Sequence, residues 1–387
     1  AMLGVIRETL RSNHYDFAVI DGFQSLRCFL AAAPEVRLFL SELSSEMALM
    51  GISLIITSDS DPRRYWEGPE FAMADAIIAL NRTLVDGHEQ RDLQVLKVRG
   101  RSHIGGHHSF EIDSNGITVH PRIETVLPTG ETLGRGDRQP FGVPGLDTML
   151  DGGPLEGSTT LLMGSLGTGK SLLADYFLAE GVRRDQRGLL ISFFETEARL
   201  LERSSAFHLP LDEARERGLL HLRMHDYPLC NPDACAEDIR RCVEELGVRR
   251  LVIDGIEPLE QSLIPQGRVT EYLAALVGYL RLRGVTTVVT FELRELVGDS
   301  ISFPSPIVGQ VAGNLILLRY AEVENRVRRF LTIVKTRYSR HSDGTAEIIF
   351  AEGVLRVVPH TEAGEAELAG AAAGTPFAAR TAGHYQT

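Results

Sequence analysis

The sequence predicts an α/β fold in which a mainly parallel sheet carries helices on both faces. Two observations predict it. Between residues 159 and 290, short continuously apolar segments alternate with segments whose apolar residues recur at helical spacing. That alternation is typical of buried parallel strands joined by crossover helices. In addition, residues 164–171 match the pattern G-x-x-x-x-G-K-[ST]. The match lies between an apolar strand and an amphipathic helix, and this strand–loop–helix order is typical of the same fold class.

The elements of this region follow one another in order along the chain. The predicted strands are 159–163, 188–193, 250–254 and 285–290, and the predicted helices are 170–180, about 197–206, 233–246 and 268–283. From residue 311 onward the pattern changes to strands at hairpin spacing, at 313–320, 328–336, 346–350 and 354–358.

The first part of the chain repeats the later part. Three segments match in order and at nearly constant separation: 17–22 with 250–255, 51–57 with 284–290, and 93–99 with 330–337. Such ordered matches predict two copies of one α/β domain. Only 20 residues precede Asp21, whereas Lys170 precedes the matching Asp254 by 84 residues. The first copy therefore has no room for a phosphate loop, and we expect it to be incomplete.

These observations predict the limits of the domains. We expect a truncated first domain at residues 1–122, a linker at 123–138, a second and complete domain at 139–358, and a disordered tail at 359–387. The linker is rich in Pro and Gly, and the tail is rich in Ala, Gly and Thr without periodicity.

Composition argues against several classes of protein. The net charge of −12 gives no general attraction for nucleic acid. No apolar run approaches the ~20 residues that a membrane-spanning helix needs, and no secretory signal pattern opens the chain. The four cysteines, at positions 28, 230, 235 and 242, have no metal-binding spacing. We therefore expect a cytoplasmic protein that binds neither membranes nor nucleic acid.

The loop at 164–171 predicts a site for a polyphosphate. Its residues are Gly164, Ser165, Leu166, Gly167, Thr168, Gly169, Lys170 and Ser171. Glycines adopt the turns with φ > 0 that bring backbone N–H groups close to the phosphates. Lys170 is expected to reach the β- and γ-phosphates, and the Ser171 hydroxyl to bind Mg²⁺. The expected ligands are ATP and Mg²⁺.

Two carboxylates follow predicted strands. Asp254 ends the strand at 250–254, where ligands bind in open α/β sheets, and is expected to hold Mg²⁺ through water. Its alternative role is that of a helix cap. Glu195 follows the strand at 188–193 and can orient or deprotonate the attacking water. Alternatively, it is a first-turn acid of the next helix, where it would favour the helix dipole.

Lys335 and Arg337 alternate on a predicted strand and therefore share one face. Two readings are open for this pair. The two cations can form a solvated strand face. They can instead form a basic finger that reaches the γ-phosphate held by a neighbouring subunit, which is worth ~10³–10⁵ in rate where it occurs.

Together these features resemble the KaiC family of RecA-like ATPases over roughly residues 5–122 and 138–358. The motifs that carry the resemblance are the phosphate loop and the segments 141–147, 193–196, 97–103 and 335–337. The resemblance implies tandem RecA-like P-loop NTPase domains and hexameric rings with ATP between subunits. It also implies that Lys335 and Arg337 are a finger for the neighbour's site. A regulatory switch and Ser/Thr kinase activity are implied as well.

The chain departs from the family pattern at three places. Phe194 replaces the first of two adjacent glutamates and leaves Glu195 alone, so hydrolysis is expected to be slow. Gly309 and Gln310 stand where clock proteins of the family phosphorylate a Ser-Thr pair, which argues against autophosphorylation there. The first copy keeps Asp21 and a finger-like Lys97-Val98-Arg99, but it lacks a phosphate loop.

Two alternative functions remain open from the sequence. A DNA-dependent recombinase or helicase-like motor uses the same phosphate loop, but it needs basic loops that face DNA. The corresponding segments 257–268 and 295–310 contain Arg268 as their only Arg or Lys. A scaffold that uses ATP only to assemble, without hydrolysis, is the other alternative.

Overall fold

The computed structural model describes most of the chain. The described residues are 2–12, 14–27, 33–59, 68–85, 88–125, 136–225, 230–263, 267–293, 312–337, 339–351 and 353–359. The predicted tail beyond Pro359, most of the predicted linker and positions 309–310 lie outside them. Contacts divide the chain into two compact units, Ala1–Thr83 with Gln90–Phe110 and Leu84–Glu89 with Glu111–Thr387. The predicted domain limits stay predictions.

A nine-stranded sheet forms the centre of the second unit, in the order β15-β14-β13-β12-β7-β11-β10-β8-β9. Its strands are β7 (Thr159–Gly164), β8 (Gly188–Ser192), β9 (Leu220–Met224), β10 (Arg250–Asp254), β11 (Thr286–Glu292), β12 (Asn314–Val323), β13 (Arg326–Thr336), β14 (Thr345–Ala351) and β15 (Val354–Pro359). The strands from β9 to β12 pair in parallel, and those from β12 to β15 pair antiparallel.

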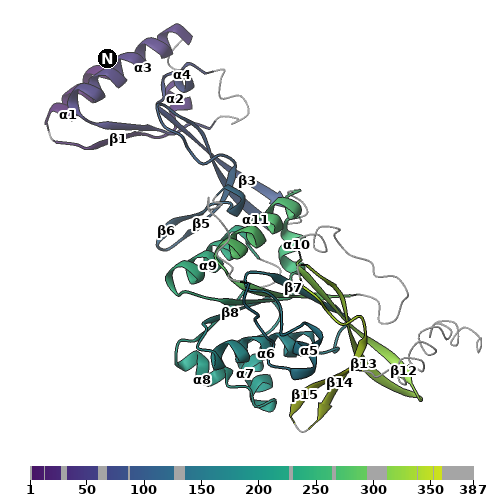
Figure 1. The fold of residues 1–387 in the computed structure, drawn as a ribbon. Helices are drawn as coiled ribbons and strands as arrows, with labels where there is room; N and C mark the ends of the chain where they lie inside the picture. Colours follow the sequence, from purple (N-terminus) through teal and green to yellow (C-terminus); the bar gives the residue numbers. More distant parts are fainter. Residues whose placement is uncertain are drawn as a thin grey trace, which may run out of the picture. The chain divides into compact units, whose positions relative to one another are not determined.

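Helices cover both faces of this sheet (Figure 1). One face carries α5 (Pro144–Met149), α6 (Lys170–Arg183), α7 (Glu197–Ala206) and α8 (Leu211–Glu216), and the other carries α9 (Pro232–Glu245), α10 (Glu257–Leu263) and α11 (Val269–Leu282). Each face has its own hydrophobic cluster, and β7, β8 and β10 contribute residues to both. Burial on both faces is the reason that these strands are continuously apolar. The predicted fold class is confirmed.

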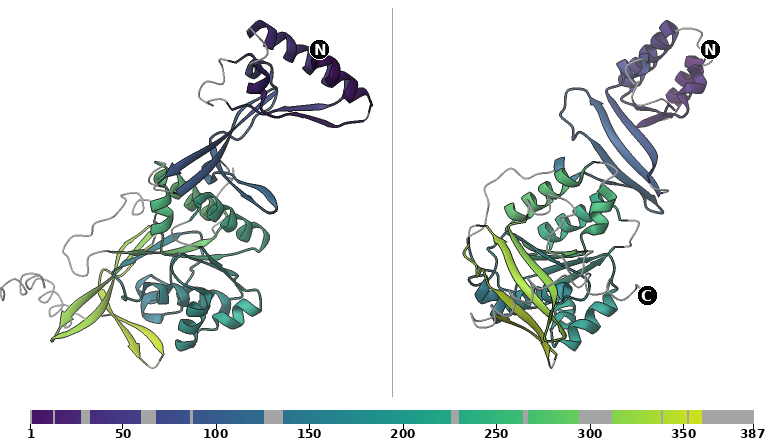
Figure 2. Two further views of the ribbon diagram at one scale, coloured as in Figure 1. Left: turned by 180° about the vertical axis from the view of Figure 1, so that it is seen from behind. Right: turned by 90° about the vertical axis from the view of Figure 1, so that its right-hand side faces the viewer.

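The antiparallel strands extend the sheet at one edge, and they are yellow-green in the views of Figure 2. The sequence pattern predicted them as hairpins, but β12 first pairs in parallel with β7, from Asn314 opposite Thr160 to Leu318 opposite Gly164. The hairpin of β12 and β13 is therefore continuous with the strand that leads into the phosphate loop.

Several elements of the second unit were not predicted, among them α5, α10, β9 and α8. The edge strand β9 contains His221 and Arg223 and is only half-buried beyond its first residue, so it lacks the continuous apolar pattern of the central strands. The short helix α8 has only six residues, too few for a clear helical period. No helix among the described residues is both long and apolar enough to cross a membrane.

The segment 141–147 leads into α5 and includes its first residues, and it has a clear structural role. The Asp147 carboxylate accepts hydrogen bonds from the backbone N–H groups of Phe141, Gly142 and Val143 at 2.7, 3.0 and 3.1 Å. Burial raises the pKa of Asp147, and these three hydrogen bonds oppose that rise. A side chain at Gly145 would meet the Val357 carbonyl oxygen at 1.8 Å, so β15 packs directly on this turn.

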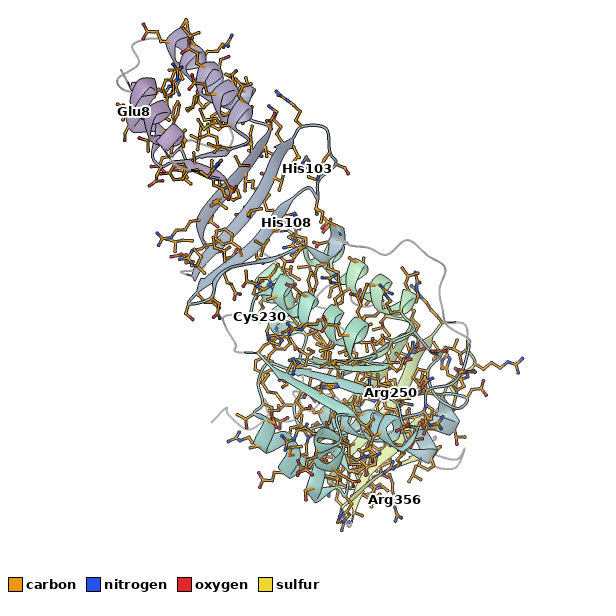
Figure 3. The ribbon with its side chains drawn as sticks, turned by 90° about the vertical axis from the view of Figure 1, so that its left-hand side faces the viewer. Glu8, His103, His108, Cys230, Arg250 and Arg356 are labelled. Carbon is orange, nitrogen blue, oxygen red and sulfur yellow. The ribbon has the colours of Figure 1, made fainter. Side chains whose placement is uncertain are left out.

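Arg250 begins β10 and is fully buried in the second unit (Figure 3). Its Nη1 donates to the carbonyls of Pro140 and Phe177, both at 2.8 Å, and its guanidinium lies 4.5 Å from the centroid of the Phe177 ring. Burial lowers the pKa of Arg250 to about 10. These bonds join β10, α6 and the segment before α5.

The first unit and the start of the second contain the earlier elements. They are α1 (Met2–Ser12), β1 (Phe17–Ile20), α2 (Phe23–Arg27), α3 (Ala33–Met50), β2 (Ser53–Ile56), α4 (Pro69–Met73), β3 (Ala76–Val85), β4 (His88–Val98), β5 (His107–Asp113), β6 (Gly116–His120) and the 3₁₀ turn η2 (Ile123–Thr125). Strands β1 and β2 pair in parallel, and β3 to β6 form a sheet in chain order. The hydrophobic cluster of the first unit contains Phe23, Val36 and Leu40.

Candidate functional site

The loop at 164–171 joins β7 to α6, as the sequence predicts. Gly169 is the N-cap of α6 and has φ 103°, a conformation that side chains disfavour. A side chain at Gly164 would meet the Leu318 carbonyl oxygen at 2.4 Å. The loop therefore lies against β12 with no room for larger residues. The N-terminus of α6 presents unpaired N–H groups, and such ends bind anions.

Lys170 is buried inside the loop, with 9% of its surface exposed. Its Nζ donates to the carbonyls of Gly164 and Ser165 at 2.8 and 2.9 Å. Burial lowers the pKa of Lys170, and the nearby carboxylates of Glu292, Glu257 and Asp254 oppose that shift. The loop thus holds a cation that can exchange its two carbonyl partners for phosphate oxygens.

Ser171 and Asp254 meet at the carboxyl edge of the sheet. The Ser171 hydroxyl donates to Oδ1 of Asp254 at 2.9 Å, and the Thr290 hydroxyl donates to the same oxygen at 2.7 Å. Hydroxyl and carboxylate oxygens are the ligands that Mg²⁺ prefers. This donor set fits the ion that the sequence predicts for Ser171 and Asp254, and helix capping is not the role of the Asp254 side chain seen here.

Two further carboxylates near Lys170 were not predicted. Glu257 begins α10, and its carboxylate accepts the backbone N–H of Glu292. Burial raises the pKa of Glu257, and Lys170 lowers it. Glu292 ends β11 as Asp254 ends β10, so the reasoning that identified Asp254 could also have found Glu292.

Glu195 follows β8 but is held by an arginine. Nη1 of Arg203 donates to the two carboxylate oxygens of Glu195 at 2.6 and 2.5 Å, and Nε of Arg203 donates to Asp175 at 2.7 Å. The alternative role as a first-turn acid is wrong, because α7 begins at Glu197 with Thr196 as its N-cap. Among the described residues, the carboxylates that act on Lys170 are those of Glu292, Glu257 and Asp254.

Phe194, next to Glu195, has 64% of its surface exposed. Its ring edge lies 2.9 Å from the position that a Cβ on Gly255 would take, directly after Asp254. The residue that replaces the first of the family's two adjacent glutamates is therefore an apolar ring that borders the turn after Asp254.

Lys335 and Arg337 are not brought to the phosphate loop of their own chain. Lys335 lies opposite Leu315, which pairs with Leu161, and the Arg337 N–H donates to Gly313 beyond it. Along the strands, the level of Lys335 lies about 10 Å from the loop at Gly164, and that of Arg337 lies about 16 Å from it. Lys335 Nζ donates to the Ala312 carbonyl at 3.1 Å. Burial lowers the pKa of Lys335, and the charge of Arg337 lowers it further.

Another cation from the same hairpin does contact the loop. Arg329 Nε donates to the Gly167 carbonyl at 3.1 Å, and its guanidinium lies over the rings of Tyr320 and Phe350, with centroids at 5.4 and 4.9 Å. Tyr320 donates its hydroxyl to the Leu166 carbonyl at 3.3 Å. No short motif marks Arg329, and only the pairing of β12 with β7 places it here.

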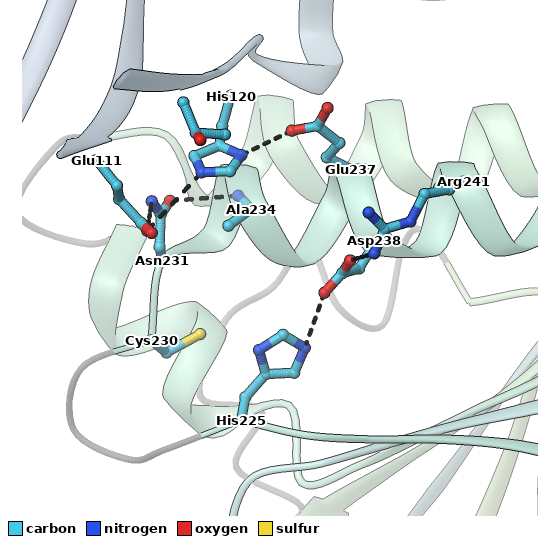
Figure 4. Close-up of a pocket in the computed structure, with 10 residues that line it drawn as sticks. Glu111, His120, His225, Cys230, Asn231, Ala234, Glu237, Asp238 and Arg241 are labelled. Atoms are coloured by element: carbon cyan, nitrogen blue, oxygen red, sulfur yellow. Dashed lines mark hydrogen bonds and ion pairs between the residues drawn. The ribbon is translucent and has the colours of Figure 1, made fainter. Parts of the chain in front are cut away.

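A cavity of about 370 Å³ lies in the second unit, beside α9 (Figure 4). His120 donates a hydrogen bond from Nδ1 to the carboxylate of Glu237 at 2.6 Å, and Asn231 donates to Glu111 at 3.0 Å. Burial raises the pKa of the lining Cys230 thiol to about 12. Within the described ranges, no group of His, Cys, Asp and Glu has the arrangement of a metal site.

Comparison with known proteins gives a consistent result. A family model described as "ATPase: KaiC" matches residues 1–124 and 139–362. The circadian clock oscillator protein KaiC of Picosynechococcus sp. is 26% identical over 362 residues, which are 91% of this chain and 68% of that protein.

Two other relatives are similar to the same extent. KaiC of Rippkaea orientalis is 27% identical over 82% of this chain and 60% of its own length, and KaiC 1 of Synechocystis sp. is 26% identical over 90% and 66%. The chain thus spans between three fifths and about two thirds of the length of these relatives. Because the family model covers most of the sequence, this chain belongs to the KaiC family of ATPases.

Proposed function

We propose that this protein is an ATPase that binds Mg·ATP at residues 164–171 and Asp254 and hydrolyses it slowly. The observation that carries the proposal is the meeting of three groups at one edge of the sheet. Lys170 lies inside a glycine-lined loop, and the Ser171 hydroxyl lies 2.9 Å from the carboxylate of Asp254. A cation, a helix N-terminus and a hard-oxygen pair are the parts that a triphosphate with a divalent ion needs.

Each residue of the site has a role in the proposed mechanism. The backbone N–H groups of the loop and Lys170 bind the phosphates. Ser171 and Asp254 would hold Mg²⁺, which when bound neutralises phosphate charge. Glu195 orients the attacking water and accepts its proton. With Phe194 in the neighbouring position, Glu195 carries this step without a second carboxylate, and turnover is expected to be slow.

We infer that the active site is completed by a neighbouring subunit. Lys335 and Arg337 lie away from the loop of their own chain, toward the opposite ends of β7 and β12. This placement supports a basic finger that acts on the next subunit of a ring, which family membership suggests is hexameric. ATP bound between subunits would couple the assembly to its nucleotide state, as in a regulatory switch.

Kinase activity toward its own chain is not part of this proposal. Gly309 and Gln310, at the expected acceptor positions, have no hydroxyl group. A DNA-dependent motor is also disfavoured. Arg268 donates to Asp233 at 2.8 Å and to Glu124 at 2.9 Å, and only 8% of its surface is exposed, so its charge is already satisfied by carboxylates.

The proposal is tested by mixing two inactive variants. Lys170→Ala removes the cation that holds the phosphates, and Arg337→Ala removes the finger. We expect the first to lose detectable ATP binding by calorimetry, and the second to bind ATP but turn it over slowly. Mixed rings would contain interfaces with both groups intact and would regain activity.

Labelled subunits confirm that exchange has occurred. If the mixture stays as inactive as either variant after exchange, the shared site is wrong. Unchanged ATP affinity in Lys170→Ala would reject the phosphate-loop assignment itself. A protein that binds ATP and assembles with it, but shows no turnover, would instead be a scaffold.

A further inference from the structure

Arg203 on α7 binds two carboxylates from different elements at the same time. Its Nη1 donates to both oxygens of Glu195, and its Nε and Nη2 donate to the oxygens of Asp175 at 2.7 and 3.3 Å. Asp175 lies on α6, four residues after Ser171. The guanidinium therefore bridges the helix that begins at the phosphate loop and the proposed catalytic carboxylate.

The two carboxylates are not equivalent. The Asp175 side chain is 1% exposed, whereas that of Glu195 is 23% exposed and lies on the segment between β8 and α7. Removal of Arg203 from Asp175 would leave a buried charge without a partner, which is strongly unfavourable. Glu195, in contrast, can exchange Arg203 for water. Arg203 thus has one permanent partner and one that can be released.

The contact with Glu195 conflicts with its proposed role. Both oxygens of Glu195 accept from Nη1, and the guanidinium therefore competes with water for the same lone pairs. Among the described residues, Glu292, Glu257 and Asp254 act on Lys170, whereas Glu195 acts on Arg203 and, together with Asp254, on Asp175. In this conformation Glu195 is turned toward α6 and α7.

We propose that Arg203, anchored on the buried Asp175, is an autoinhibitory latch that holds Glu195 out of the phosphate site. The inference rests on the proposed function, in which Glu195 activates water. Hydrolysis then requires that Glu195 leave Arg203, and Asp175 keeps the guanidinium in place when it does.

The test removes both charges of the pair between Asp175 and Arg203 together. In Asp175→Asn/Arg203→Gln, two amides can hydrogen-bond to each other, and no buried charge is left unpaired. We expect kcat to rise on the order of fivefold, the scale of one partly exposed ion pair. KM should not change, because the loop is untouched. Arg199→Gln is the matched control, since Arg199 is an exposed arginine on the same helix and its substitution should change neither constant.

A second variant tests the latch if the double variant does not fold. Arg203→Lys keeps a positive charge beside Asp175 but lacks the planar fork that bridges both carboxylates. It should also raise kcat with KM unchanged. Thermal melting and ATP calorimetry confirm that each variant is folded and binds nucleotide.

Glu195→Gln separates failure of the latch from failure of the proposed function. In the wild type it should abolish turnover, and in the unlatched background it should abolish the gain. If Glu195→Gln abolishes turnover but the unlatched variants are slower than or equal to the wild type, the latch is overturned and the proposed function stands. If Glu195→Gln leaves wild-type turnover unchanged, Glu195 is not the base, and both the latch and that part of the mechanism are rejected.

Discussion

The two copies in this chain build the same turn at the end of a parallel strand pair. In the first copy, Thr57 donates its hydroxyl to Asp21 at 2.5 Å and accepts the Gly22 N–H at 2.9 Å. In the second copy, Thr290 does the same with Asp254 and Gly255, at 2.7 and 2.7 Å. The three residues of each turn occupy matching positions of the sequence repeat.

The copies differ in what surrounds this turn. Asp254 also accepts the Ser171 hydroxyl of the phosphate loop, and in the described residues of the first unit no such loop meets Asp21. Strands β1 and β2 alternate between exposed and half-buried residues, whereas β10 and β11 are buried almost throughout. The carboxylate turn is therefore a local property of two paired strands, while a ligand site needs the loop and helix beside it.

The largest expected difference between the copies is the effect on turnover of neutralising the strand-end carboxylate, Asp254 in the second copy and Asp21 in the first. Asp254→Asn removes the charge that faces Ser171, and we expect turnover to fall ~10²-fold or more because the Mg²⁺ site is lost. The matched variant Asp21→Asn should leave turnover unchanged. Steady-state ATPase assays of the two purified variants measure this. An equal loss in both would mean that the first copy takes part in hydrolysis.

The fingers of the two copies give the next comparison. Arg337→Ala should lower turnover by ~10- to 10³-fold with ATP binding retained, because a cation in trans acts mainly on the transition state. Arg99 at the matching position donates to Asp75 at 3.0 Å, and Arg99→Ala should not alter turnover. If Arg337→Ala does not change turnover, Lys335 and Arg337 form a solvated strand face and not a finger.

The third prediction concerns the pH dependence of stability that Asp175, the buried carboxylate on α6, gives to the second copy. Burial raises the pKa of Asp175 from 3.8 to about 7, against the opposing effect of Arg203. Between these two pH values the folded protein keeps a proton that the unfolded chain has released. Asp175 therefore favours folding most at the acid end of the window, and this contribution is lost as pH rises from 3.8 to about 7.

The check is the pH dependence of unfolding by urea. In Asp175→Asn, the free energy of unfolding should depend less on pH between 3.8 and about 7 than it does in the wild type. Above that range, the two proteins should show the same dependence on pH. If the wild type and Asp175→Asn have the same slope between pH 4 and 7, Asp175 stays ionised in the folded protein throughout.

The smallest expected effect tests packing around the paired strands. Val252 in β10 is fully buried, whereas Val19 at the matching position of β1 is 63% exposed. Val252→Thr buries a hydroxyl and should cost about 1–3 kcal/mol of unfolding free energy. Val19→Thr should change it by less than about 0.5 kcal/mol. Denaturant titration compares them. A large cost at Val19 would show that the exposed face of β1 is covered in solution.

The fold class, the phosphate loop and the strand-end carboxylate could each be predicted from the sequence. Each depends on neighbours in the chain or on a period of two or 3.6 residues, so each leaves a local pattern. The alternating strands and helices, the glycine spacing at 164–171 and Asp254 after an apolar run are such patterns. The repeat was visible for the same reason, because its matching segments keep their order and spacing.

Tertiary packing determines which groups the charged side chains contact. Arg203 joins Asp175 to Glu195, Arg329 reaches the loop at Gly167, and Arg268 is neutralised by Asp233 and Glu124. Every one of these side chains belongs to a type that is normally solvated, and the segments that carry them show no period that selects a partner. These ion pairs and hydrogen bonds form between residues that packing brings together, at sequence separations of 8 and 162 residues in the first two cases. The chain order therefore identifies Lys170 and Asp254, and only the packing of α6, α7 and the β12–β13 hairpin around β7 determines which other charged residues meet at the site.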